Sequence, residues 1–462
     1  MIMNPVAAQA YAREGHWSST PVFVLALAGA AAGFGNIWKF PHLVGTNGGS
    51  AFLLLYLVCL VCLGFPLLVA EIVLGRRGQG GAVTALGQLA VLESRWPLWR
   101  IAGYMGLLAC CLLLSTYSVI GGWSLAYVFR SASGALLDLD ALQAVEVFQQ
   151  LIRDPERLLA WHTVFLGLAI MVVSRGLRHG VEEAMRWFMP AVFLFLLLLL
   201  VYAAIVSGQF KEAVAVMLRP DFSALSWRSV QLAMTHAFYT LTLGLGVVVI
   251  YSAYLNEKAS ILKASIAVIA VDTVLSLLAG LFVFSVLFSH ALGSVSGPSL
   301  VFQSMPVAFG QLPNGFWFAT LFFLMLAFAA WTSIIAMLEP MVAHLVERRG
   351  VERTHATAYV GVVIWFLGVL ALLSFSLWSH FRPLQWLAKY REANLFDLFN
   401  LLAVNVLMPI SALAIAVFVG WRLTERSVEL ELGAGKMFRL WLFLIRYVTP
   451  PALLLILVGG FV

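Results

Sequence analysis

Two apolar stretches of the chain are each interrupted near their middle by two glycines that stand beside polar side chains. The first interruption, residues 28–36, reads AGAAAGFGN, and the second, residues 240–246, reads TLTLGLG. Glycine weakens a helix interior. An unwound turn frees backbone N–H groups, which attract a carboxylate, and carbonyl oxygens, which bind small hard cations. The two interruptions together predict one site for a cation and an amino acid; glycines that only let helices pack closely are the alternative.

Further polar side chains lie inside other apolar stretches. The hydroxyls of Thr332 and Ser333 are suited to ligate a cation, and bonding back to their own helix carbonyls is an equal alternative. Acids at membrane depth are costly and mark functional sites by default, which singles out Asp272. Glu71 and Glu339 stand near the inner ends of their stretches, where a structural, hydrogen-bonded acid has the same weight.

The composition excludes a water-soluble globule. Of the 462 residues, 62% are hydrophobic and 11% are charged, against about 25% charged residues in a typical soluble domain. Disordered chains, disulfide-stapled secreted modules and cytosolic enzymes fit poorly. The net charge of +6 indicates basic cytoplasmic loops rather than nucleic-acid binding. The four cysteines lie in apolar runs, which predicts inert thiols and no metal site: Cys59, Cys62, Cys110 and Cys111.

The apolar pattern predicts eleven membrane spans, all helical because lipid offers no partner for an unpaired backbone group. The spans are 21–43, 51–74, 101–130, 160–175, 185–207, 229–255, 262–290, 316–346, 357–376, 396–421 and 438–461. The first stretch is too long for a signal-peptide core, so we expect it to be retained. Lys and Arg are more frequent in the loops that follow the even-numbered spans, which predicts a cytoplasmic N-terminus and an outer C-terminus.

The matching interruptions in spans one and six are typical of two five-helix inverted repeats whose unwound helices line a site at the membrane midplane. We therefore divide the chain into a cytoplasmic N-terminal segment (1–20), a first repeat (21–207), a second repeat (208–421), and a cytoplasmic loop with an eleventh helix (422–462). An uncharged outer loop at about 291–315 is expected to form a short hairpin, either a lid or a connector.

Three further segments carry a family resemblance. Gly29–Pro41, which contains GNIWKFP, Asn47–Phe52 and Gly64–Arg76 closely resemble the neurotransmitter:sodium symporter family with the LeuT fold. The resemblance covers most of the chain, and eleven spans resemble many bacterial members. It implies an all-α polytopic membrane protein of the bacterial inner membrane, with a 5+5 inverted repeat, unwound first and sixth helices and one extra C-terminal helix.

The resemblance implies two sodium ions. One would be held by the carbonyls of Gly29, Ala32 and Ala329 and by the hydroxyls of Thr332 and Ser333. The other would be held by the Ala31 carbonyl, Asn36, Thr240, Asp272 and the substrate carboxylate. All of these ligands are hard oxygens, which is the donor type that sodium requires.

The resemblance also implies where a substrate lies. Tyr117 and the backbone of Gly33 and Gly35 would hold its carboxylate, and Tyr239 would cover it. Monoamine carriers of the family place Asp at the position of Gly33, so glycine here leaves room for a carboxylate. The implied substrate residues are Ala30, Ala31, Gly33, Phe34, Gly35, Leu113, Tyr117, Tyr239, Thr240, Thr242, Leu245, Ser333 and Met337. They form an apolar pocket, which favours a small neutral, hydrophobic amino acid.

Gates and an anion position follow from the same resemblance. Lys39 and Asp397 match the outer gate, while Tyr254, Glu347 and Arg13 match the inner gate. The chloride position of animal members corresponds to Tyr56, His236, Thr240, Asp272 and Ser276. We hypothesise that the Asp272 carboxylate replaces chloride, so that transport is chloride-independent. Asp272 and His236 would form either a titrating pair that allows proton antiport or a static hydrogen bond.

The implied function is sodium-coupled uptake by alternating access, in which spans one, two, six and seven move against the rest. An ion channel, a non-transporting amino acid sensor of the same fold and a membrane-embedded enzyme are the alternatives. A channel needs a continuous polar pore, and the helices carry no polar stripe. An enzyme needs a catalytic constellation, and the chain carries no His–Glu metal cluster or nucleophile elbow.

Overall fold

The computed structural model describes residues 15–288 and 297–460, and regular structure within these ranges is helical. Within these described ranges, nine continuous segments are long and apolar enough to span a bilayer. They comprise α4 (Ser50–Cys59) with α5 (Phe65–Gly78), α7 (Arg100–Ala132), α9 (Pro155–Ser174), α10 (Glu183–Val206), α14 (Ile261–Phe288), α16 (Gly315–Arg349), α17 (Arg353–Leu373), α18 (Leu395–Asn400) with α19 (Met408–Val417), and α21 (Lys436–Phe443) with α22 (Thr449–Gly459). Their bounds agree with the predicted spans to within a few residues for all but the fifth, which begins earlier, at a π-helical turn over Leu177–Glu182.

The two remaining predicted spans are broken, as the sequence predicted. Span one consists of α2 (Thr20–Ala31) and a second part, Gly35–Thr46, which includes α3 (Phe40–Thr46) and is bent by 62° from the first. Span six consists of α12 (Trp227–Tyr239) and α13 (Val247–Ala253). Between them Gly244 and Gly246 have φ angles of 79° and 82°, a left-handed conformation that glycine adopts without steric cost.

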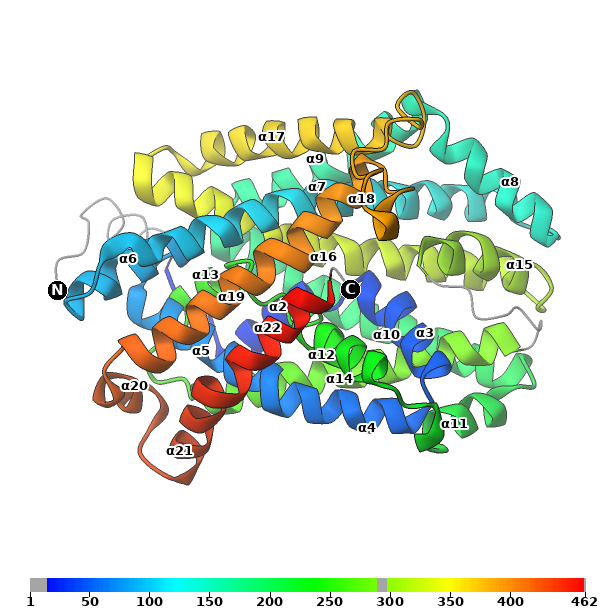
Figure 1. Ribbon diagram of the computed structural model, residues 1–462. Coiled ribbons are helices and arrows are strands. Elements are labelled where there is room, and N and C mark those ends of the chain that lie inside the picture. The colour runs from blue at the N-terminus through cyan, green and yellow to red at the C-terminus, as the bar shows by residue number, and fades with distance from the viewer. Residues whose placement is uncertain (1–14, 289–296, 461–462) are drawn as a thin grey trace.

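Long helices run side by side, with α17 along one edge of the bundle and α4 and α14 along the opposite edge (Figure 1). The short helices α6 (Ala82–Leu92) and α20 (Glu425–Leu432) lie at one end of the bundle, and α8 (Ala141–Ile152) and α15 (Met305–Gly310) lie at the other. Another short helix, α11 (Phe210–Leu218), precedes α12. The separation of these connecting helices agrees with the alternation of inner and outer loops that the span order predicts.

The outer loop differs from the expected hairpin. Residues 291–296 of that loop lie outside the described residues, but a π-helical turn over Leu300–Ser304 continues into α15. Pro306 lies in the first turn of α15, where its missing N–H has no helical partner to lose. The two Pro-Gly turn signals of the loop flank this helical stretch, and the hairpin expectation is wrong for residues 300–310.

Helix α20 is fastened to the inner end of α5 by a salt bridge. The Arg76 guanidinium lies 2.6 Å from the Glu431 carboxylate and donates a further bond to the Ala259 carbonyl at 2.6 Å. The Arg76 side chain is 7% exposed and that of Glu431 is 23% exposed. This contact ties the loop after α19 to spans two and six on the inner side.

Candidate functional site

A small central cavity lies between the two broken spans. About 20 Å³ is free, and the walls come from Ala30, Ala31, Gly35, Asn36, Leu113, Tyr117, Tyr239, Thr240, Thr242, Leu245, Ser333, Met337 and Met408. All but two of the predicted substrate residues are therefore brought together, from spans one, three, six and eight. The exceptions are Gly33 and Phe34. Two residues on the wall, Asn36 and Met408, were not predicted as substrate contacts.

Gly33 has a different role from the predicted one. A Cβ atom at this position would lie 2.1 Å from the Tyr117 hydroxyl oxygen and 3.2 Å from the Ser333 hydroxyl oxygen. The space beside Gly33 is thus filled by Tyr117, whose hydroxyl accepts a bond from the Phe34 N–H at 2.9 Å. Glycine is required because the tyrosine approaches the backbone, and the expectation of open space at this position is corrected.

The five predicted ligands of one sodium ion converge between α2 and α16. The Ser333 hydroxyl oxygen lies 3.3 Å from the Gly29 carbonyl, 3.3 Å from the Ala32 carbonyl and 3.2 Å from the Ala329 carbonyl. The Thr332 hydroxyl donates to the Ala329 carbonyl at 2.9 Å. One hydroxyl proton cannot satisfy three carbonyl oxygens, so a small cation among them would complete the bonding. Neutral hard oxygens fit sodium in this position.

The predicted ligands of the other ion form a buried network around Asp272, which is 1% exposed. The Asn36 amide donates to Asp272 Oδ1 at 2.8 Å and to Ser276 Oγ at 2.8 Å. The Thr240 hydroxyl donates to the Asp272 oxygens at 3.0 and 3.1 Å, and the Tyr56 hydroxyl lies 3.5 Å from Oδ2. Among the described residues no basic side chain forms a salt bridge with Asp272. A sodium ion beside this carboxylate would offset its buried charge.

His236 does not contact Asp272. Its ring lies against Phe40 and Tyr56, with ring centroids 5.6 and 5.3 Å apart. Neither of its ring nitrogens has a hydrogen-bond partner in the described part of the chain. The pairing of Asp272 with His236, as a titrating couple or as a static bond, is therefore wrong for this structure, because Tyr56 provides the contact to the carboxylate instead.

Glu71 holds the unwound turn of span six. Its Oε1 accepts a bond from the Gly244 N–H at 2.6 Å, and the side chain is fully buried. The unwound turn has lost its helical hydrogen bonds, so the carboxylate supplies a partner for a backbone donor that would otherwise be unsatisfied. The structure thus decides in favour of a structural acid at Glu71.

A second cavity of about 610 Å³ opens outward from the central one and shares Gly35, Tyr117 and Tyr239 with it. Lys39 and Asp397 both line this outer cavity, as expected for an outer gate. They do not form a salt bridge: the Lys39 ammonium lies 5.1 Å from the centre of the Tyr239 ring, and Asp397 accepts a bond from the Asn394 N–H at 3.1 Å. The two predicted gate residues therefore line one cavity without pairing in this structure.

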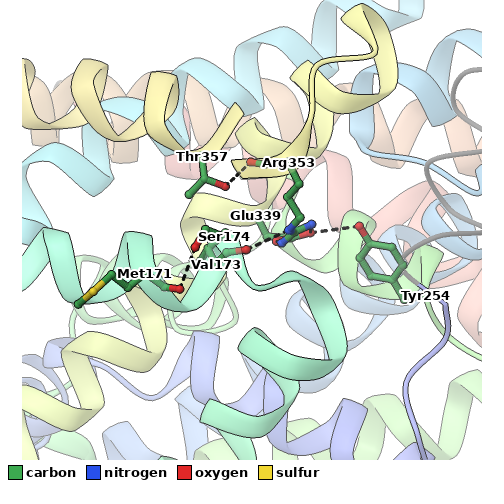
Figure 2. A network of polar contacts seen from close by, with 7 residues as sticks. All are labelled: Met171, Val173, Ser174, Tyr254, Glu339, Arg353 and Thr357. Atoms are coloured by element: carbon green, nitrogen blue, oxygen red, sulfur yellow. Dashed lines mark hydrogen bonds and ion pairs between the residues drawn. The ribbon is translucent and has the colours of Figure 1, made fainter. Parts of the chain in front are cut away.

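At the end of the bundle that is predicted to face the cytoplasm, a buried network surrounds Glu339, which is 0% exposed (Figure 2). Arg353 donates to both Glu339 oxygens, at 3.0 and 2.5 Å, and to the Val173 carbonyl at 2.9 Å. The Tyr254 hydroxyl donates to Glu339 Oε1 at 3.1 Å. The network joins α13, α16, α17 and α9, so Glu339 connects a broken span to the helices that surround it.

Glu347, another predicted inner-gate residue, has different partners. Glu347 accepts bonds from the Gly81 N–H at 2.9 Å and from the Thr84 hydroxyl. Arg13 lies outside the described residues. Trp17 adds to the closure, since its indole N–H donates to the Tyr251 carbonyl at 2.8 Å and its backbone N–H donates to the Tyr254 carbonyl at 3.1 Å.

Two residues of this arrangement were missed by the sequence reasoning. Arg353 begins α17, and a basic residue four residues before a predicted span carries no signal that separates it from the other basic residues of the loops. Met408 begins α19 and is fully buried. An isolated methionine in an apolar span carries no sequence signal that separates it from packing residues.

Residues 13–139 and 142–462 match the protein family described as "Sodium:neurotransmitter symporter family". An uncharacterized sodium-dependent transporter of Bacillus subtilis, YhdH, is 36% identical over 95% of this chain and 96% of its own. An uncharacterized sodium-dependent transporter of Haemophilus influenzae is 30% identical over 96% of this chain and 97% of its own. The crystal structure of MhsT in complex with L-phenylalanine superposes with a TM-score of 0.86 at 32% identity, over 97% of this chain and 100% of that chain.

Proposed function

Because the chain belongs to the sodium:neurotransmitter symporter family, is a sodium-dependent transporter and has the LeuT fold, we propose that it imports a neutral, hydrophobic amino acid by symport with sodium. The observation that carries the substrate class is the central cavity. Its wall combines backbone and hydroxyl groups of the two broken spans with apolar side chains, and none of the described residues that line it is charged. MhsT, which has been crystallised with phenylalanine, is similar over nearly the whole chain and supports an amino acid substrate.

Two sodium ions are part of the proposal. The oxygens around Ser333 and those around Asp272 form two separate sets: the first includes carbonyls of span one, and the second meets side chains of both broken spans. The substrate carboxylate would complete the set around Asp272, so each ligand raises the affinity for the other. This mutual dependence couples the sodium gradient to amino acid uptake.

Chloride independence is also proposed. Asp272 places a fixed negative charge beside the sodium ligands Asn36 and Thr240, at 2.8 and 3.0 Å. A bound chloride would bring a second negative charge next to that carboxylate, which is unfavourable in a buried site. The carboxylate is thus proposed to take the place that chloride occupies in animal members.

The remaining parts of the proposal concern the placement of the chain. Residues 21–207 and 208–421 form the two five-helix repeats, followed by the segment 422–462 with the eleventh helix. The N-terminus faces the cytoplasm and the C-terminus faces outward across a bacterial inner membrane. The open outer cavity and the closed inner network around Glu339 support an outward-facing arrangement.

Uptake into proteoliposomes tests the function. With sodium outside, uptake of L-leucine or L-phenylalanine is expected to exceed uptake in choline by a large factor, and L-lysine and L-aspartate are expected not to compete. Replacing chloride by gluconate is expected to leave uptake unchanged, while Asp272→Asn is expected to make uptake dependent on chloride. Uptake that is equal in sodium and in choline would refute symport, and a steep chloride requirement of the unmodified protein would refute chloride independence.

A further inference from the structure

Span ten contributes one side chain to the central cavity. Met408 lines that cavity together with Leu113, Leu245 and Met337, and its side chain is fully buried. The other three come from spans three, six and eight. Met408 thus adds a wall from a helix that also carries Asp397 on the outer cavity.

The position of Met408 is fixed by close backbone contacts at two glycines. A Cβ atom at Gly244 would lie 2.5 Å from the Met408 carbonyl oxygen, and a Cβ atom at Gly106 would lie 2.7 Å from the Gly244 carbonyl oxygen. The Ser411 hydroxyl, one turn after Met408, donates to the Ala102 carbonyl at 3.0 Å. Span ten therefore rests directly on the unwound turn of span six, which in turn rests on α7.

The local backbone of span ten also points to this position. The residues before Met408, Leu401–Leu407, form a π-helix, and α19 starts at Met408 with Pro409 in its first turn. A π-helical segment changes the direction in which the following side chains project, and such segments are frequent at functional sites. The change occurs at the residue that reaches the cavity.

The chemistry of the wall determines which side chains can yield to a substrate. Only about 20 Å³ is free, which is room for about one water molecule, so the wall has to move to admit a substrate side chain. Leu113 and Leu245 are branched, whereas methionine is unbranched, has three rotatable bonds and makes favourable contacts between its sulfur and the edge of an aromatic ring. The two methionines are the residues that adapt to a large side chain.

We propose that Met408 is a specificity-determining residue that sets the upper size of the substrate side chain, and that its thioether packs against an aromatic ring, so that aromatic amino acids are substrates. This inference rests on the proposed function, since it assigns the side-chain class of the same amino acid site. Span ten would then take part in substrate selection through Met408, in addition to its outer-gate residue Asp397.

Substitution of Met408 by a rigid and by a small residue tests the inference. Sodium-dependent binding of L-valine and of L-phenylalanine to the purified full chain is measured by competition. Met408→Phe is expected to weaken L-phenylalanine binding by about tenfold or more while L-valine changes by less than about threefold. Met408→Ala is expected to weaken L-valine by about tenfold relative to L-phenylalanine, because the smaller ligand no longer fills the wall.

Met325→Ala is the matched control, since Met325 is a fully buried methionine of α16 that does not line the cavity. Its ratio of the two dissociation constants is expected to stay within about twofold of the unmodified protein. Thermal unfolding in detergent shows whether each variant is folded. If Met408→Phe does not fold, Met408→Ala is compared with Met408→Leu instead, because leucine is closest to methionine in volume.

The outcomes separate the inference from the proposed function. A ratio that does not change in any folded Met408 variant overturns the inference, as does an unmodified protein that binds L-valine but not L-phenylalanine; both leave the proposed function intact. An unmodified protein that binds no hydrophobic amino acid in sodium overturns the proposed function, and the inference with it.

Discussion

Replacing Arg353 by glutamine is expected to destabilise the protein strongly. The change removes the guanidinium that donates to both oxygens of Glu339, at 3.0 and 2.5 Å, and to the Val173 carbonyl at 2.9 Å. Figure 2 shows that Arg353 and these two partners come from three different helices. Glu339 is 0% exposed and the Arg353 side chain is 11% exposed, so water cannot replace the lost donor at the carboxylate.

The magnitude follows from burial. Removal of one partner from a buried ion pair leaves an uncompensated charge and costs about 3–5 kcal/mol. The double variant Glu339→Gln with Arg353→Gln leaves no buried charge, so its cost is expected to be smaller than that of Arg353→Gln alone. The free energy of unfolding should therefore rank the unmodified protein first, the double variant second and Arg353→Gln last.

Denaturant or thermal unfolding in one detergent, followed by tryptophan fluorescence, measures this order. The matched control is Arg157→Gln, because the Arg157–Asp154 salt bridge of 3.0 Å has side chains that are 64% and 33% exposed. An exposed pair contributes about 0–1 kcal/mol. Both variants remove a guanidinium group, Arg353→Gln from a buried pair and Arg157→Gln from an exposed pair.

The function should change with the stability. The network closes the inner side, so loss of the network lowers the fraction of molecules that can bind sodium from outside. The apparent dissociation constant for sodium equals the intrinsic constant divided by that fraction, and it therefore rises. An Arg353→Gln variant that loses less than about 1 kcal/mol, or a double variant less stable than the single one, would refute the reasoning from buried charge.

Three further predictions concern a predicted sodium ligand, the glycine beside Tyr117 and the salt bridge of α20. Thr332→Ala is expected to weaken sodium binding by at least about tenfold, as loss of even an indirect metal contact does, whereas Ser265→Ala, another buried hydroxyl bonded to its own helix, should leave a sodium titration unchanged. Gly33→Ala is expected to abolish amino acid binding, because the new Cβ would lie 2.1 Å from the Tyr117 hydroxyl and would displace it. Titration calorimetry measures the affinity for the amino acid, and an affinity equal to that of the unmodified protein would contradict the prediction. Glu431→Gln is expected to cost about 1 kcal/mol of unfolding free energy by weakening the charged bond to α20; an unchanged midpoint would argue against that contact.

The sequence determined the helices, the two breaks and the ligand types. Apolar runs of bilayer length define the spans because lipid leaves the backbone no other partner. Glycines beside Asn36 and Thr240 marked the interruptions, since glycine is the residue that tolerates the positive φ angles of 79° and 82° found in span six. Family resemblance then assigned oxygens to each sodium position, and the structure brings both sets together.

Only the tertiary structure decided which side chains meet. Glu339 pairs with Arg353, a partner that the sequence did not indicate, and His236 packs among aromatic rings instead of bonding to Asp272. Lys39 and Asp397 stand apart across the outer cavity because that cavity is open, which is a property of the conformation and not of either residue.

The role of Gly33 and the presence of Met408 in the cavity wall were likewise fixed by packing. Hydropathy and glycine spacing are local properties of the sequence, and they predict whether a segment spans the lipid and where its helix unwinds. The distance between a tyrosine of span three and a glycine of span one, or between span ten and an unwound turn of span six, depends on how helices far apart in sequence lie against one another. That arrangement is set by the sum of many packing contacts, and no single segment encodes it.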